Sequence, residues 1–308
     1  MRKKSLMNSS SRRIIKKNIA LYLLLMPTIL YFLIFRYVPI YGLQIAFKEY
    51  NPFIGYKDSP WVGFKHFQSF FNSIYFFRLV RNTFLLSFYS ILFGFPIPII
   101  FALFLNELKS EKFRSVIQSI SYVPHFISTV IICGLIVNFL SPSTGFVNAV
   151  IKALTGNTID FLRKPEWFRT IYVGSGIWQQ MGWNSIIYYA SIRAIDPFLY
   201  EAADIDGANR WQKMIRISLP SILPTIITLL LLNLGNIMNV GFEKVFLLYT
   251  PNTYQTADII STYVYRSGLV DQQYSFATAV GLFNSIINLL LLVIFNSVSK
   301  KASGESLW

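Results

Sequence analysis

The chain alternates long uncharged, apolar runs with short charged segments. Most of these runs exceed the roughly 20 residues that an α-helix needs to cross the hydrocarbon core of a bilayer. The pattern therefore predicts an all-α membrane protein with six transmembrane helices. The predicted spans are residues 18–38, 82–106, 115–140, 170–192, 217–242 and 272–299.

Two of the predicted spans contain residues that interrupt helices. Proline lacks a backbone N–H and crowds the preceding turn, so Pro96 and Pro98 predict a kink in the second span. Pro124 and His125 predict an interruption of the third span. In a bilayer, neighbouring helices must satisfy the backbone groups that such breaks release, so we expect these breaks to be packed against other spans.

Composition agrees with a membrane protein. The chain has 308 residues, of which 54% are apolar and only 14% are charged, whereas an average soluble domain has about 25% charged residues. A net charge of +14 would suggest nucleic-acid binding in a soluble protein, but the anionic cytoplasmic leaflet and the positive-inside bias explain it here. The single cysteine, Cys133, excludes an intrachain disulfide and a thiolate metal site.

The first residues form a basic segment. Residues 1–17 contain seven Lys and Arg residues and no acidic residue. The apolar run that follows is too long for the h-region of a signal peptide and has no small-x-small cleavage pattern near its end. We therefore expect a basic cytoplasmic tail over residues 1–17, a transmembrane domain over residues 18–300 and a short cytoplasmic tail over residues 301–308.

The distribution of basic residues predicts the orientation. With the N-terminus inside, the cytoplasmic segments hold 16 of the 28 Lys and Arg residues, and the outer loops 36–81, 141–169 and 243–271 hold 12. These outer loops are together nearly twice as long, so the density of basic residues is higher on the inside. Both termini and residues 195–220 are then expected in the cytoplasm.

Residues 195–220, which we call the elbow, predict a helix, a glycine hinge and a second helix. Asp196 can cap a helix N-terminus with Pro197 at its first position, and Gly207 can end that helix in the left-handed conformation. Asn209 and Gln212 have the spacing of a capping box for the second helix. Such an elbow suits a surface that another protein binds, although it could also be a simple connector.

Three short motifs in the elbow resemble a known family. The EAA sequence at 201–203, DGA at 206–208 and LP at 219–220 resemble the EAA loop of ABC importer permeases, in their maltose-type, carbohydrate-uptake branch. Met214 departs from the aromatic residue usual in that family, and the resemblance covers about residues 15–300. The residues that it assigns to ATPase docking in the coupling helix are Glu201, Ala202, Ala203, Asp206, Gly207, Ala208, Arg210, Leu219 and Pro220.

The resemblance implies a permease subunit of a type I ABC importer for a carbohydrate, an oligosaccharide or polysaccharide fragment, in a bacterial cell membrane. The implied partners are a second homologous permease, two copies of an ABC ATPase and an extracellular solute-binding lipoprotein. Because the chain contains no G-x-x-x-x-G-K-[ST] sequence, ATP and Mg are expected on the partner ATPase. The chain itself is expected to hold no cofactor or metal and to catalyse no covalent reaction.

Amide and indole side chains mark a candidate sugar pathway. Amides can donate to and accept from sugar hydroxyls, and indole faces cover the apolar side of a pyranose ring. The resemblance implies sugar contacts on the spans that flank the EAA loop. The candidate residues are Trp178, Gln179, Gln180, Trp183 and Asn184 on the fourth span, and Asn233, Asn236 and Asn239 at helical spacing on the fifth. Alternatively, these amides could hydrogen-bond only to neighbouring helices.

Two other functions remain open. A permease for an amino acid, a polyamine or phosphate would want an intramembrane countercharge, and no Asp, Glu, Lys or Arg lies in the middle of a predicted span, although a partner permease could supply one. A stand-alone channel or secondary carrier is disfavoured because the chain shows neither coupling ionisable residues nor halves of inverted topology.

Overall fold

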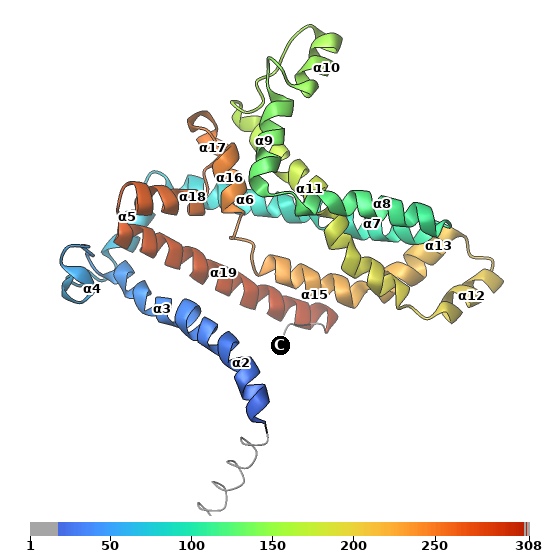
Figure 1. The fold of residues 1–308 in the computed structure, drawn as a ribbon, viewed down its shortest axis with the longest axis horizontal. Helices are drawn as coiled ribbons and strands as arrows, with labels where there is room; N and C mark the ends of the chain where they lie inside the picture. Colours follow the sequence, from blue (N-terminus) through green and yellow to red (C-terminus); the bar gives the residue numbers. More distant parts are fainter. Residues whose placement is uncertain (1–17, 305, 307–308) are drawn as a thin grey trace, which may run out of the picture.

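The computed structural model describes residues 18–304 and 306, and in this range the chain is built from helices (Figure 1). The only β pairing among these residues is an isolated bridge between Lys48 and Trp61. The all-α prediction is therefore confirmed. The predicted basic tail, residues 1–17, lies outside the described residues.

The first apolar run forms one long helical segment on the outside of the bundle. It consists of α2 (Ile19–Phe32), a π-helical turn η1 (Leu33–Tyr37), α3 (Val38–Gly42) and a 3₁₀ turn η2 (Leu43–Phe47). No residue of α2 is buried in the single chain. The segment packs against the bundle through η2, which contacts α19 (Tyr274–Ser303).

The second run is a nearly continuous helix. It consists of α6 (Phe76–Gly94) and α7 (Pro96–Glu107), separated only at Phe95. Pro96 occupies the first position of α7, where a missing N–H costs little. The kink predicted at Pro96 and Pro98 is therefore only a local interruption at Phe95. The 32-residue segment Phe76–Glu107 still counts as one span.

Two other runs are sharply bent. The segments Glu111–Phe126 and Thr129–Leu140 meet at 99°, because the chain leaves α8 (Glu111–Tyr122) through the 3₁₀ turn η3 (Val123–Phe126) before α9 (Thr129–Leu140) begins. This confirms the interruption predicted at Pro124 and His125. The segments Arg210–Ser221 and Leu223–Leu234 meet at 58°.

By length and apolar composition, three helical segments of the described chain can cross a membrane, or five if each bent pair is counted as one span. The predicted span that is not among these five is the fourth, residues 170–192, which lies in α11 (Pro165–Arg193), a helix of 29 residues with many polar ones. Figure 1 shows α11 in the middle of the bundle, where it packs against α6, α7 and α8.

The remaining helices have at most 12 residues each. They are α4 (Gly55–Asp58), α5 (Lys65–Phe71), α10 (Phe146–Thr155), α12 (Pro197–Ile205), α13 (Arg210–Lys213), η4 (Met214–Ser218), α14 (Leu219–Ser221), α15 (Leu223–Leu234), α16 (Phe242–Leu248), η5 (Pro251–Thr253), α17 (Tyr254–Ala257), α18 (Ile260–Tyr265) and η6 (Arg266–Val270). Figure 1 shows α12 and α13 at one end of the bundle and α4 and α5 at the other.

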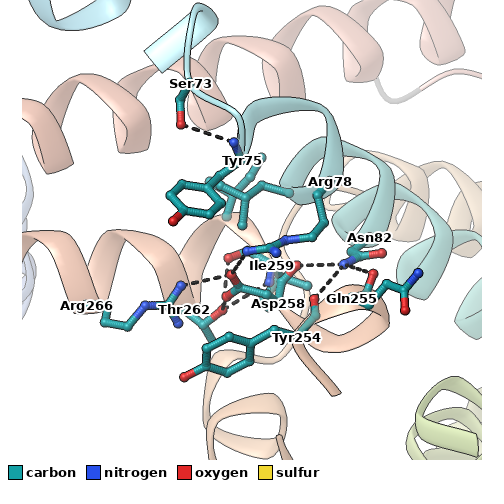
Figure 2. Close-up of polar contacts among 12 residues, drawn as sticks. Ser73, Tyr75, Arg78, Asn82, Tyr254, Gln255, Asp258, Ile259, Thr262 and Arg266 are labelled. Atoms are coloured by element: carbon teal, nitrogen blue, oxygen red, sulfur yellow. Dashed lines mark hydrogen bonds and ion pairs between the residues drawn. The ribbon is translucent and has the colours of Figure 1, made fainter. Parts of the chain in front are cut away.

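A buried carboxylate joins helices that are distant in sequence (Figure 2). Asp258 is fully buried and accepts from Arg266 at 2.8 Å and from Arg78 at 3.2 Å. Asn82 of α6 donates to the backbone carbonyl of Asp258 and accepts from Arg169 of α11. Although burial alone disfavours the charged form, bonding to Asp258 raises the pKa of Arg266 above its ordinary value. We call Asp258, Arg78, Arg266, Asn82 and Arg169 the Asp258 network.

Candidate functional site

A cavity of about 650 Å³ lies between α11, the junction of α6 and α7, α15 and α16. Its walls include five of the eight predicted pathway residues. These are Gln179, Gln180, Trp183, Asn184 and Asn233. The other three, Trp178, Asn236 and Asn239, are not among its lining residues.

The aromatic side of the cavity is held by a stacked pair. The indole ring of Trp183 and the imidazole ring of His125 are parallel, with centroids 4.3 Å apart. The Nδ1 atom of His125 lies 2.8 Å from Oε1 of Gln180, within hydrogen-bonding distance. Because His125 belongs to η3, the break between α8 and α9 positions both Trp183 and Gln180 of α11.

The amides of the cavity also hydrogen-bond within the bundle. Gln179 donates to the backbone carbonyl of Ile127, which follows η3, and Asn233 donates to the carbonyl of Leu229 one turn earlier in α15. The structure is thus compatible with both roles expected of these amides, hydrogen bonding to neighbouring helices and contact with a sugar in the cavity. Each amide side chain keeps further donor or acceptor capacity for a solute.

The predicted asparagine face of the fifth span is interrupted. Helix α15 ends at Leu234, residues 235–238 form turns and residues 239–240 have no regular structure, so Asn236 and Asn239 do not continue the helical face of Asn233. Helix α19 supports this break, because Asn288 accepts a hydrogen bond from the backbone N–H of Met238 at 2.8 Å. Asn284 of the same helix donates to Asn239.

Two charged residues line the cavity, and the sequence had placed both in an outer loop. Lys244 and Glu243 belong to α16, which returns to the bundle after the non-helical segment 235–240. Lys244 is only 8% exposed and donates to the carbonyl of Tyr172 on α11 at 3.0 Å. No pattern in the sequence reveals this placement, because α16 has only seven residues and two of them are charged.

The elbow has the predicted local structure. Asp196 accepts from the backbone N–H of Phe198 at the start of α12, and Gly207 has a φ of 73° after its end. The backbone N–H of Asn209 donates to the side chain of Gln212, and the N–H of Gln212 donates back to Asn209, which completes the capping box. The helix, glycine and helix sequence of the elbow is therefore confirmed.

The surface of the elbow combines free charges with apolar side chains. Glu201, Asp206 and Arg210 are exposed, and none of them forms a salt bridge within the described part of the chain. Ile205 beside them is 88% exposed, whereas Asp204 is paired with Lys213 at 2.6 Å. The other predicted docking residues are Ala202, Gly207 and Pro220, which are exposed, and Ala203, Ala208 and Leu219, which are half-buried.

The base of the elbow is packed into the bundle. Met214 and Ile222 belong to one buried apolar cluster with Tyr188 and Ile192 of α11 and with residues of α7. In addition, the hydroxyl oxygens of Tyr200 in α12 and Ser218 in η4 are 2.9 Å apart and share a hydrogen bond. A movement of the elbow therefore has a direct mechanical path to α11, the helix that carries Gln180 and Trp183.

Sequence and structure comparisons agree on the relatives of this chain. Residues 75–304 match the family model described as binding-protein-dependent transport system inner membrane component. The chain is 44% identical to Protein LplB of Bacillus subtilis (strain 168), over 96% of this chain and 92% of that protein. It is 43% identical to the polygalacturonan/rhamnogalacturonan transport system permease protein YteP of the same organism, over 94% of this chain and 90% of that protein.

A solved structure is similar along nearly the whole chain. A chain in the crystal structure of a bacterial ABC transporter involved in the import of the acidic polysaccharide alginate is 49% identical, with a TM-score of 0.89, and the match covers 96% of this chain and 99% of that one. The same transporter type, in complex with an alginate pentasaccharide-bound periplasmic protein, gives a TM-score of 0.88 at 48% identity.

Proposed function

The chain belongs to the family of binding-protein-dependent transport system inner membrane components, and from this membership we propose that it is a permease subunit of an ATP-driven importer for oligosaccharides or polysaccharide fragments. The observation that carries the proposal is the likeness to the alginate importer over 96% of this chain. The cavity supports it, because amides and an indole ring together match the hydroxyls and the apolar face of a sugar.

The cavity forms this subunit's half of the translocation pathway, and a second homologous permease supplies the other half. We also count α11, the fourth predicted span, as a transmembrane helix, which brings the total to six. Its 29 residues are about 43 Å long at 1.5 Å per residue, enough to cross a bilayer core of about 30 Å. Its low apolar content follows from the polar residues that it presents to the cavity.

The elbow docks one of two ATPase subunits on the cytoplasmic side. Glu201 and Asp206 supply polar contacts, the exposed Ile205 and Ala202 supply apolar ones, and Gly207 provides the hinge. ATP and Mg bind the ATPase and not this chain. When the ATPase dimer closes, the elbow moves, and the cluster around Met214 passes that movement to α11 and so to the cavity.

The opposite end of the bundle faces outward and receives sugar from a solute-binding lipoprotein. The two regions lie apart, because Figure 1 shows α12 and α13 of the elbow toward one end of the bundle and α17 and α18, which flank Asp258, toward the other. The density of basic residues places the elbow end in the cytoplasm. The names of the polygalacturonan/rhamnogalacturonan permease and of the alginate importer support a polysaccharide fragment as the cargo.

The test is to purify the full chain with its partners from its own membrane and to measure ATP hydrolysis against a panel of oligosaccharides in lipid nanodiscs. We expect an ATPase, a second permease and a solute-binding protein to co-purify, and at least one sugar to stimulate hydrolysis. A chain that purifies alone and moves solute into liposomes without ATP would overturn the importer function.

A further inference from the structure

Lys244 is a buried cation on the wall of the cavity. The residue is only 8% exposed, and it lies in α16 on the side of the cavity that faces α11. Its ammonium group donates to the carbonyl oxygen of Tyr172 at 3.0 Å and lies 5.0 Å from the centroid of the Tyr172 ring. Within the described residues, no carboxylate lies within salt-bridge distance of it.

A buried charge of this kind is normally paired. Removing an ammonium group from water costs several kcal/mol unless an opposite charge or several hydrogen bonds replace the lost hydration. A lysine ammonium has three donors, and one carbonyl and one ring face occupy only part of this capacity. The site therefore favours an additional acceptor, and an anion would be the strongest one.

The space for such an acceptor lies inside the cavity. Gly176 of α11 stands opposite Lys244, and a Cβ atom on Gly176 would lie 3.5 Å from the ammonium nitrogen. Because Gly176 has no side chain, space remains beside the ammonium group that a larger residue would fill. Glu243 also lines the cavity, but it is exposed to solvent and forms no salt bridge with Lys244.

We propose that Lys244 binds the carboxylate of an acidic sugar, so that this pathway selects uronate oligosaccharides over neutral ones. The inference rests on the proposed function and adds the chemical class of the cargo. The carboxylate pairs with the ammonium group, while the amides of Gln180 and Asn233 contact hydroxyls and Trp183 covers the ring face. Lys244 thus supplies the countercharge that the predicted spans lack.

The test uses the complete purified importer without its binding protein and measures equilibrium binding by ligand-observed NMR, which detects weak complexes. The probes are trisaccharides of galacturonate and of mannuronate, each compared with its uncharged methyl ester. We expect the importer to bind at least one acid about tenfold more tightly than its ester. Lys244→Met should reduce the affinity for that acid to the level of the ester and leave the affinity for the ester unchanged.

Two further variants separate a charge effect from a packing effect. Lys244→Arg keeps the charge and should retain most of the preference for the acid, whereas Glu243→Gln removes the neighbouring negative charge and should not weaken acid binding. Equal binding of acid and ester by the unchanged importer, or an equal loss of both in Lys244→Met, would overturn the inference. If the inference fails in this way but neutral sugars still bind and stimulate ATP hydrolysis, the proposed function stands. If no sugar binds and none stimulates ATP hydrolysis, the inference and the proposed function both fail.

Discussion

The indole ring of Trp183 stacks on the imidazole ring of His125, with centroids 4.3 Å apart and an angle of 2° between the two planes. His125 lies in the turn where the segment ending in η3 meets α9 at 99°. A break in one helix therefore fixes the orientation of an aromatic side chain on another. His125 covers one face of the indole and Phe126 packs nearly perpendicular to it, with centroids 5.5 Å apart, so a solute must approach Trp183 from another side.

We predict that Trp183→Ala weakens sugar uptake. Loss of an aromatic platform should raise the KM for the transported sugar about tenfold, or about 1.4 kcal/mol, without reducing ATP hydrolysis in the absence of sugar. Trp178→Ala is the matched control, because Trp178 lies on the same helix but does not line the cavity. Uptake kinetics in proteoliposomes would test this, and equal effects of the two substitutions would contradict it.

The hinge of the elbow can be tested with a pair of glycines. Gly207 and Gly156 both have φ near +75° and open space where a Cβ would lie, so Val costs a similar local strain of about 1–2 kcal/mol at each. We expect Gly207→Val to reduce sugar-stimulated ATP hydrolysis at least fivefold and Gly156→Val, at the end of α10, to leave it nearly unchanged. A similar loss in both variants would show that strain alone, and not coupling, is responsible.

The crossing of α8 and α11 depends on Gly182. A Cβ atom on this glycine would lie 2.2 Å from the backbone carbonyl oxygen of Ser121, so the two helices could not keep their present distance. We predict that Gly182→Ala destabilises the subunit by about 1–3 kcal/mol. The measurement is the midpoint of thermal unfolding of the purified complex.

Gly174 provides the control for that measurement. It lies on the same helix, and nothing lies within 4 Å of its hypothetical Cβ. Gly174→Ala should therefore leave the unfolding midpoint unchanged or raise it slightly, since alanine is the better helix former. A midpoint for Gly182→Ala equal to that of Gly174→Ala would refute the close crossing.

Asp258 is predicted to be essential for the stability of the end of the bundle opposite the elbow. Asp258→Asn would leave Arg78 and Arg266 without their buried counterion, which typically costs about 3–5 kcal/mol. Glu49→Gln breaks the ion pair with Lys65, which is at the surface, and should cost at most about 1 kcal/mol. The yield of folded subunit and its unfolding midpoint would compare the two, and a similar small effect of both would be evidence against the role of Asp258.

The local structure of the elbow could be read from the sequence because it depends on neighbours in the chain. The cap at Asp196, the left-handed Gly207 and the capping box of Asn209 and Gln212 each involve residues at most three positions apart or a single backbone angle. The helical class and the bend at Pro124 follow in the same way from apolar run length and from proline chemistry.

The cavity was only partly predictable. Gln179, Gln180, Trp183 and Asn184 share one stretch of α11 and could be found from their chemical types. The expected continuation of the asparagine face failed at Gly235, where the chain leaves α15 for turns that α19 supports. Helical spacing cannot reveal such a break, because the group that repairs it, Asn288, lies 50 residues further along the chain.

The sequence alone determined that this is a helical membrane protein with a capped elbow, since those features follow from composition and from interactions within a few residues. Only the tertiary structure decided that Lys244 lies on the cavity wall and that Asp258 pairs with Arg78, 180 positions away. Both residues sit in a polar stretch that resembles an ordinary outer loop. The physical reason is that the burial of a charge depends on which distant helices surround it, and no local pattern encodes that.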